Sequence, residues 1–285
     1  MSTIRANGLD IGYDVHGAGP PLVLLHGATS LGKEDFAAQI PGMAKAFLLH
    51  LPDARGHGRT AWDARDGFEY RWLVDDLTAF VDALGLDSFH LVGFSMGAMT
   101  ALQFGARMPE RLRTLVVVGI TTHREPRASV GRRLMAPPVI LERDPTFAAT
   151  LARRHDAGQG EGAWQRLLPA IAADIAAQPL LTPAELHGID CPTMVVCGDR
   201  DPFVPTEHAA GLARQLPAGR LFIAPDSGHE VMARRPGLFN EAMAGFYRST
   251  EEIARKRAAL VETVGVPSGV HGAPAAPPSP RGGTA

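Results

Sequence analysis

The chain has 285 residues, of which 45% are hydrophobic, so it can form one large α/β domain or two ordinary domains with a full core. Its formal net charge of −2 argues against nucleic-acid and membrane partners. Residues 1–8 lack the apolar segment of a secretory signal, and no apolar run approaches the roughly 20 residues of a membrane-spanning helix. Cys191 and Cys197 lack metal-ligand spacing, so we expect reduced thiols in a cytoplasmic protein.

The first 120 residues predict strands that alternate with helices. Residues 4–15 have the pattern of a hairpin with Asn7-Gly8 at its turn. Apolar runs predict further strands at 21–25, 47–51, 89–92 and 115–118. Apolar residues at helical spacing between Leu73 and Leu84, followed by Gly85, predict an amphipathic helix that ends there. This alternation is typical of a doubly wound, parallel α/β sheet.

The alternation stops at residue 121 and resumes at 191. Residues 121–190 contain no convincing strand, so we interpret them as a helical insertion with helices near 147–154 and 164–177. Strands are expected again at 193–197 and 221–224, and helices near 236–248 and 251–264. The chain therefore divides into a first core part (1–120), the insertion (121–190), a second core part (191–264) and a tail (265–285). Pro, Gly, Ala and Ser dominate the tail, which we expect to be disordered.

The functional interpretation depends on the stretch Gly93-Phe94-Ser95-Met96-Gly97. It lies between the strand at 89–92 and residues 98–107, which are rich in helix formers. In this strand–turn–helix context, Gly-x-Ser-x-Gly forms a tight turn that directs the serine hydroxyl out of the sheet. The two glycines lack Cβ atoms that would clash in such a turn. We therefore expect Ser95 to be a nucleophile, the alternative being a simple N-cap of the helix.

A serine nucleophile needs a base that takes its proton and a third group that orients the base. His229 follows the last predicted strand in a turn-like Asp-Ser-Gly-His cluster, so it should lie at the carboxyl edge of the sheet with Ser95. His57 is the competing candidate, because it also lies in a loop after a strand. Its neighbours Arg55 and Arg59 would disfavour the imidazolium that a base becomes. We expect His229 to be the base.

The orienting acid should follow another strand. Asp199 and Asp201 both come directly after the strand at 193–197, whereas the loop after 115–118 contains no carboxylate. Asp201 lies farther into its loop and is better placed to reach a neighbouring histidine, and Pro202 keeps its backbone extended. Asp199 can instead bond the backbone of its own turn. We predict Asp201, which gives the chain order Ser, Asp, His.

A tetrahedral oxyanion requires donors, and two backbone N–H groups are candidates. Met96 begins the predicted helix, where N–H groups lack partners, and Ala28 lies in the small-residue loop after the strand at 21–25. We also place His26, Phe94 and Trp164 at the substrate pocket, with His26 mainly shaping its loop. Four arginines of the insertion are explained either by attraction of an acidic substrate or by a solvated helix face: Arg124, Arg127, Arg132 and Arg133.

The combined motifs resemble the α/β-hydrolase superfamily over about residues 4–248. The motifs that carry the resemblance are His26-Gly27, the Asp-Ala-Arg-Gly-His-Gly-Arg-Thr loop at 53–60, the serine turn at 93–97, the Gly-Asp-Arg-Asp-Pro loop at 198–202, and Gly228-His229. The resemblance implies a mostly parallel eight-stranded sheet, a nucleophile elbow and a helical cap inserted after the sixth strand, which residues 121–190 match. It also supports Asp201 as the acid. Esterase, enol-lactonase and cofactor-free haloperoxidase-like members are the most similar branch, although many carry a third glycine at the position of Ala98.

From these residues we expect a serine hydrolase that cleaves a small-molecule ester, lactone or thioester through an acyl-enzyme. No metal or organic cofactor is expected, because the sequence contains neither metal-spaced clusters nor a phosphate-binding glycine loop. One alternative keeps the site but cleaves a carbon–carbon bond, as the similar meta-cleavage-product hydrolases do. A second alternative is a noncatalytic binding protein or cyclase on the same scaffold. The oligomeric state is not predicted.

Overall fold

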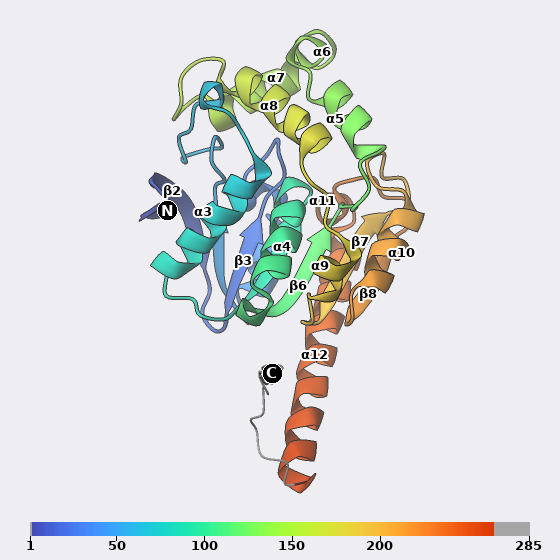
Figure 1. Cartoon of the computed structure of the whole chain (residues 1–285). Coiled ribbons are helices and arrows are strands. Elements are labelled where there is room, and N and C mark those ends of the chain that lie inside the picture. The colour runs from blue at the N-terminus through green and yellow to red at the C-terminus, as the bar shows by residue number, and fades with distance from the viewer. Residues whose placement is uncertain (1, 265–285) are drawn as a thin grey trace, which may run out of the picture. The chain divides into compact units, whose positions relative to one another are not determined.

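The computed structural model describes residues 2–264 (Figure 1). The chain divides into two compact units, residues 1–244 and 245–285, and the first contains the whole sheet and the candidate site. In the second unit the described residues, 245–264, are helical. The predicted disordered tail, 265–285, lies outside the described residues.

Eight strands form a single mostly parallel sheet in the order β1-β2-β4-β3-β5-β6-β7-β8. The strands are β1 (Ser2–Ala6), β2 (Leu9–His16), β3 (Pro21–Leu25), β4 (Leu48–Pro52), β5 (Phe89–Phe94), β6 (Leu112–Val118), β7 (Thr193–Gly198) and β8 (Gly219–Ala224). Strands β1 and β2 form the expected hairpin, and β2 also pairs antiparallel with β4. All other neighbouring pairs are parallel. The predicted eight-stranded, doubly wound α/β fold is therefore confirmed.

The central strands are buried because helices cover them. Every residue of β7 is buried, and β3, β5 and β6 are buried over almost their whole length. This explains their continuous apolar sequences, which differ from the alternating pattern of a strand with one wet face. Figure 1 shows α3 (Tyr70–Ala83) and α4 (Met96–Arg107) side by side across the front of the sheet.

The remaining helices complete the core and form the insertion. They are α1 (Gly32–Asp35), α2 (Ile40–Met43), α5 (Arg127–Leu134), α6 (Pro137–Arg143), α7 (Pro145–His155), α8 (Ala163–Ala177), α9 (Pro183–His187), α10 (Thr206–Gln215), α11 (Val231–Arg234) and α12 (Pro236–Val264), with 3-10 turns at Ala64–Asp66 and Pro109–Arg111. Helices α5 to α8 gather beyond one end of the sheet, at the top of Figure 1.

Two details of the helices differ from the sequence expectations. The helices expected near 236–248 and 251–264 form one continuous helix, α12, because no glycine or proline interrupts the helix formers between them. Helix α9 falls within the predicted insertion, yet it contacts α4 and α10 of the core. Its Leu186 is 1% exposed, so burial against the core determines where this last segment of 121–190 lies.

Strand β3 marks the point where the sheet changes its winding direction. It pairs with β4 on one side and with β5 on the other, so the loops after β3 and β5 leave the sheet in opposite directions. A crevice opens at the carboxyl ends of strands at such a point. The loop after β3 carries Ala28, and the turn after β5 carries Ser95.

Candidate active site

Ser95 lies in a strained turn between β5 and α4. Its φ of 51° is a left-handed conformation that a serine adopts only where the surroundings enforce it. A Cβ atom at Gly93 would lie 2.3 Å from the Gly97 carbonyl oxygen, and one at Gly97 would lie 2.4 Å from the Leu25 carbonyl oxygen. Only glycine fits at either position, which explains the Gly-x-Ser-x-Gly sequence physically.

The structure brings Ser95, His229 and Asp201 into one hydrogen-bonded row. His229 Nε2 lies 2.9 Å from Ser95 Oγ, and Nδ1 lies 2.8 Å from Asp201 Oδ2. An ionised carboxylate can only accept, so Nδ1–H donates to Asp201 and Nε2 is free to accept the serine proton. The Asp201 carboxyl is fully buried.

Backbone groups hold Asp201 in place. Its Oδ1 accepts the N–H groups of Phe203, at 2.8 Å, and Val204, at 3.2 Å, which leaves Oδ2 for His229. The rings of Phe94 and Phe203 pack against the imidazole, with centroids 5.0 and 4.4 Å away. These two ring contacts restrict the rotation of His229.

The competing residues lie elsewhere. Asp199 accepts the Ser227 N–H at 3.1 Å, as expected for a residue that stabilises its own turn. His57 is fully buried behind the loop after β3, and its burial, together with neighbouring His26, lowers its pKa to about 4. Our expectation that Arg55 and Arg59 disfavour its charge was wrong. Both arginines are paired with aspartates, so desolvation is the dominant cause.

The two candidate oxyanion donors lie in segments next to the nucleophile: Met96 follows Ser95 in the chain, and Ala28 lines the same cavity as Ser95. Within residues 2–264, neither the Met96 N–H nor the Ala28 N–H donates to a protein acceptor. The Gly97 N–H donates to the His26 carbonyl at 3.0 Å and ties the two loops together. Both N–H groups are therefore available to a ligand, as an oxyanion hole requires, and their role stays a prediction.

His26 orients the peptide that carries the Ala28 N–H. Its Nε2 accepts the Ala54 N–H at 2.9 Å, so Nδ1 carries the proton and donates to the Gly27 carbonyl at 2.8 Å. Because a trans peptide directs its C=O and N–H to opposite sides, this bond turns the Ala28 N–H away from His26. Burial lowers the His26 pKa to about 4 and keeps the ring neutral in this role. His26 therefore shapes the loop, as the sequence suggested.

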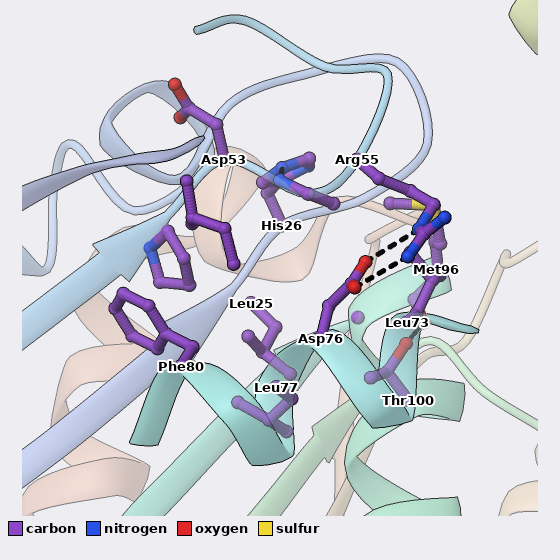
Figure 2. Close-up of a pocket in the computed structure, with 14 residues that line it drawn as sticks. Leu25, His26, Asp53, Arg55, Leu73, Asp76, Leu77, Phe80, Met96 and Thr100 are labelled. Carbon is purple, nitrogen blue, oxygen red and sulfur yellow. Dashed lines mark hydrogen bonds and ion pairs between the residues drawn. The ribbon is translucent and has the colours of Figure 1, made fainter. Parts of the chain in front are cut away.

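Figure 2 shows how the loop behind His26 is anchored. The guanidinium of Arg55 donates two hydrogen bonds of 2.6 Å to the Asp76 carboxylate on α3. The two side chains are 6% and 9% exposed and border a small void of about 40 Å³. The guanidinium also lies 4.6 Å from the ring centre of Trp62 and 5.2 Å from that of Trp72. These contacts fix the neighbouring Ala54 N–H, which in turn fixes the His26 tautomer.

Helix α7 of the insertion holds the same loop from the opposite side. Arg154 donates to the Thr29 carbonyl at 2.7 Å and to the Glu34 carboxylate at 2.6 Å. The adjacent His155 is fully buried, and its ring lies edge-on to His57 with centroids 5.1 Å apart. The position of α7 is thus coupled to the loop that carries Ala28.

A cavity of about 800 Å³ opens at Ser95 and His229, and we call it the Ser95 cavity. The loop after β3, the serine turn, helices α5 to α7 and the loops after β7 and β8 form its walls. Its apolar lining includes Phe94, Met135, Ile140 and Phe147, so the insertion supplies much of the surface that faces Ser95. A volume of this size suits a small organic molecule.

Two of the three predicted pocket residues do not line this cavity. Phe94 does line it, whereas His26 borders the small void of Figure 2. The side chain of Met96, which was predicted only as an oxyanion donor, borders the same void. Trp164 is 2% exposed and packs inside the insertion, where α8 meets its neighbours. An aromatic residue at helical spacing served the hydrophobic core here, and the sequence pattern alone does not separate the two roles.

Sequence reasoning also missed Gly119, the residue directly after β6. Its φ is +64°, and a Cβ atom there would lie 2.8 Å from His229 Cε1 and 2.9 Å from Nδ1. Gly119 therefore leaves the space that the imidazole occupies. A glycine at the carboxyl end of a predicted central strand was the available signal.

The arginines of the insertion separate into different environments. Arg124 bonds carbonyls at the end of α8, including that of Gln178 at 3.0 Å. Arg127 is 4% exposed, and Arg132 lies 3.9 Å from Glu125 on the surface. Of these four, Arg133 alone lines the Ser95 cavity, where Arg143 of α6 joins it.

The model of the Alpha/beta hydrolase family matches residues 22–242, a span that includes the serine turn, Asp201 and His229. The chain belongs to the alpha/beta hydrolase family. Its described residues contain no group of three His, Cys, Asp or Glu side chains that could hold a metal ion. Within residues 2–264, no helix has both the length and the apolar character needed to cross a membrane.

Relatives within the alpha/beta hydrolase family are hydrolases of several kinds. The chain is 29% identical over 255 residues to the serine hydrolase BPHL of Mus musculus. This match covers 85% of this chain and 84% of that protein. It is 27% identical over 253 residues to a 2-hydroxy-6-oxononadienedioate/2-hydroxy-6-oxononatrienedioate hydrolase of Klebsiella pneumoniae. This second match covers 81% of this chain and 85% of that protein. Among solved structures, Est816, described as an N-acyl homoserine lactone degrading enzyme, superposes with a TM-score of 0.70 at 26% identity, covering 86% of this chain and 100% of that chain.

Proposed function

We propose that this alpha/beta hydrolase cleaves a small-molecule ester, lactone or thioester through an acyl-enzyme on Ser95. The observation that carries the proposal is the row Ser95–His229–Asp201, with separations of 2.9 and 2.8 Å. Nucleophile, base and orienting acid are within hydrogen-bond reach of one another, and the row opens into the Ser95 cavity. The similarity to a serine hydrolase and to a lactone-degrading enzyme supports this chemistry.

The proposed reaction starts with proton transfer. His229 Nε2 takes the Ser95 proton while Oγ attacks the carbonyl carbon of the substrate, and Asp201 stabilises the imidazolium that forms. The Met96 and Ala28 N–H groups donate to the tetrahedral oxyanion. His229 then gives its proton to the departing oxygen or sulfur, which leaves an ester on Ser95. Water, deprotonated by His229, attacks this ester and regenerates the serine.

The direct test compares the wild type with Ser95→Ala. We expect the wild type to react with a fluorophosphonate probe and to hydrolyse p-nitrophenyl butyrate or a γ-lactone. Loss of the serine should abolish labelling and reduce kcat on the order of 10⁴- to 10⁶-fold. A variant that retained activity within tenfold of the wild type would exclude the mechanism.

A second candidate is hydrolysis of a carbon–carbon bond at the same site. The 27% identity to the Klebsiella pneumoniae hydrolase favours it, although the loop at 53–60 differs from the one usual in meta-cleavage-product hydrolases. Turnover of a vinylogous diketone without turnover of simple esters would support this candidate. A noncatalytic binding protein or cyclase is less favoured, because such relatives usually lack a member of the triad.

We also propose a cytoplasmic location and a small-molecule substrate as the main partner. Cys191 and Cys197 are both buried free thiols, a state typical of a reducing compartment. Burial raises the pKa of Cys191 to about 11 and that of Cys197 to about 12, so neither thiol competes with Ser95 as a nucleophile. Fractionation of the source cells would test the location.

A further inference from the structure

The Ser95 cavity carries two arginines that have no acidic partner among the residues that the structure describes. Arg133 and Arg143 both line it, and both are exposed. Among the described residues, neither forms an ion pair with Asp or Glu. Arg133 occupies the last turn of α5 and Arg143 the last turn of α6, so each extends from a helix end that faces the cavity.

The acidic residues of the same cavity are already engaged. Asp144 caps α7 by accepting the Phe147 N–H at 2.9 Å. Asp226 accepts from Arg200 at 2.9 Å, and Glu230 lies 3.6 Å from Arg234. Asp226 and Glu230 therefore each face an arginine other than Arg133 and Arg143, and Asp144 faces the positive end of α7. Among the described residues, Arg133 and Arg143 have no carboxylate within ion-pair distance.

The remaining cavity lining is largely apolar. Phe94, Phe203 and the α5–α7 residues Met135, Ile140 and Phe147 surround the space between the serine and the arginines. An apolar body therefore fits beside Ser95, and a negative group fits at the arginine side. Arginine is well suited to a carboxylate or phosphate, because its planar guanidinium donates two parallel hydrogen bonds.

From this arrangement we propose that the substrate carries an anionic group, a carboxylate or a phosphate, separated from the scissile carbonyl by an apolar segment. Arg133 and Arg143 bind that group while Ser95 attacks the carbonyl. The inference rests on the proposed hydrolase function, and it names the substrate class of that site. A different explanation for the arginines, stabilisation of the negative ends of α5 and α6, would affect folding but not the choice of substrate.

The test uses ester pairs that differ in one charge. The first pair is the mono-p-nitrophenyl ester of adipic acid and its methyl ester, which places the charge on the acyl side. The second pair is the butyrate of p-hydroxyphenylacetic acid and its methyl ester, which places the charge on the alcohol side. We expect kcat/KM for the anionic member of at least one pair to exceed that of its neutral partner roughly tenfold. The preferred pair identifies the half of the substrate that carries the charge.

The variants separate the proposed role from a purely structural one. In the Arg133→Gln, Arg143→Gln double variant, the ratio of anionic to neutral kcat/KM should fall to about one, because the loss is expected mainly for the anionic ester of each pair. Arg133→Glu should reverse the preference by repelling the anion. The matched control is Arg132→Gln, since Arg132 is the neighbouring exposed arginine of α5 but does not line the cavity, and it should keep the wild-type ratio.

Ionic strength gives an independent readout. At about 1 M salt the Debye length is only about 3 Å, so the wild-type preference should shrink while neutral turnover stays constant. Equal kcat/KM within both pairs, or an unchanged ratio in the double variant, would overturn the anionic site and leave the hydrolase proposal intact. Turnover of none of the four esters would count against both proposals.

Discussion

Replacing Gly119 with alanine should damage the proposed reaction without any direct contact to the substrate. The added Cβ would lie 2.8 Å from His229 Cε1, and ordinary contact begins at 3.4 Å, so the imidazole has to move by about 0.6 Å. His229 Nε2 lies 2.9 Å from Ser95 Oγ, and a displacement of that size along this line would lengthen the separation to about 3.5 Å, beyond the range of about 2.6–3.2 Å in which a base is effective. Misplacement on this scale reduces kcat on the order of 10²-fold.

Gly85→Ala is the matched control for this variant. Gly85 has nearly the same backbone angle, with φ of +67° against +64°, but an added Cβ meets nothing within 4 Å. Both variants should lose roughly 1–2 kcal/mol of unfolding free energy, because alanine is disfavoured in this conformation. Only Gly119→Ala should lose kcat. Urea unfolding and p-nitrophenyl butyrate kinetics on both variants measure the two effects separately, and a Gly119→Ala enzyme within threefold of wild-type kcat would refute the reasoning.

Three further outcomes are expected. Asp201→Asn should lower kcat on the order of 10³- to 10⁴-fold, because an amide neither enforces the His229 tautomer nor stabilises its charge, whereas Asp199→Asn should cost about tenfold; equal losses in the ester assay would contradict this assignment. Stability should fall by about 2 kcal/mol per buried histidine between pH 7 and 5, since His26 and His57 have a pKa of about 4 when folded and about 6.5 when unfolded, so that only the unfolded chain gains protons there. Identical urea midpoints at the two pH values would rule that out. Trp164→Ala should cost about 3–5 kcal/mol of unfolding free energy while relative kcat/KM among esters stays unchanged, and a shift in substrate preference would return Trp164 to the pocket.

Two aspartates oppose the histidine effect, because burial raises the pKa of Asp35 and that of Asp174 to about 6. Asp35 is half-buried beside the loop after β3, and it accepts the Gly27 N–H at 2.9 Å. In the folded state each of these carboxyls gains a proton at a higher pH than in the unfolded chain, which favours the folded state by about 1 kcal/mol per aspartate at pH 5. The histidine effect is larger, so the net change remains a loss of stability.

Local sequence determined most of the fold. Strands such as β3 and β7 are continuous apolar runs because both of their faces are buried, and this pattern is visible without coordinates. The same holds for the serine turn, where close backbone approach excludes every residue except glycine at 93 and 97. The interruption of the strand–helix alternation after residue 120 likewise followed from composition alone. Each of these features leaves a contiguous or closely spaced pattern in the sequence, even where its cause is a distant contact, as between Gly97 and the Leu25 carbonyl.

Tertiary structure alone decided which groups meet in space. His57 and His229 both follow strands, yet only His229 forms a hydrogen bond with Ser95. The path of the loop after β8 brings the His229 Nε2 atom to 2.9 Å from Ser95 Oγ. Trp164 and Phe147 are both aromatic residues of the insertion, and the packing of α8 against α5 and α7 assigned one to the core and the other to the cavity. Whether Arg133 has an ion-pair partner among the described residues likewise depends on the contacts that each acidic residue of the cavity makes. Such assignments are set by contacts between residues far apart in the chain, and these contacts leave no periodic signal in the sequence.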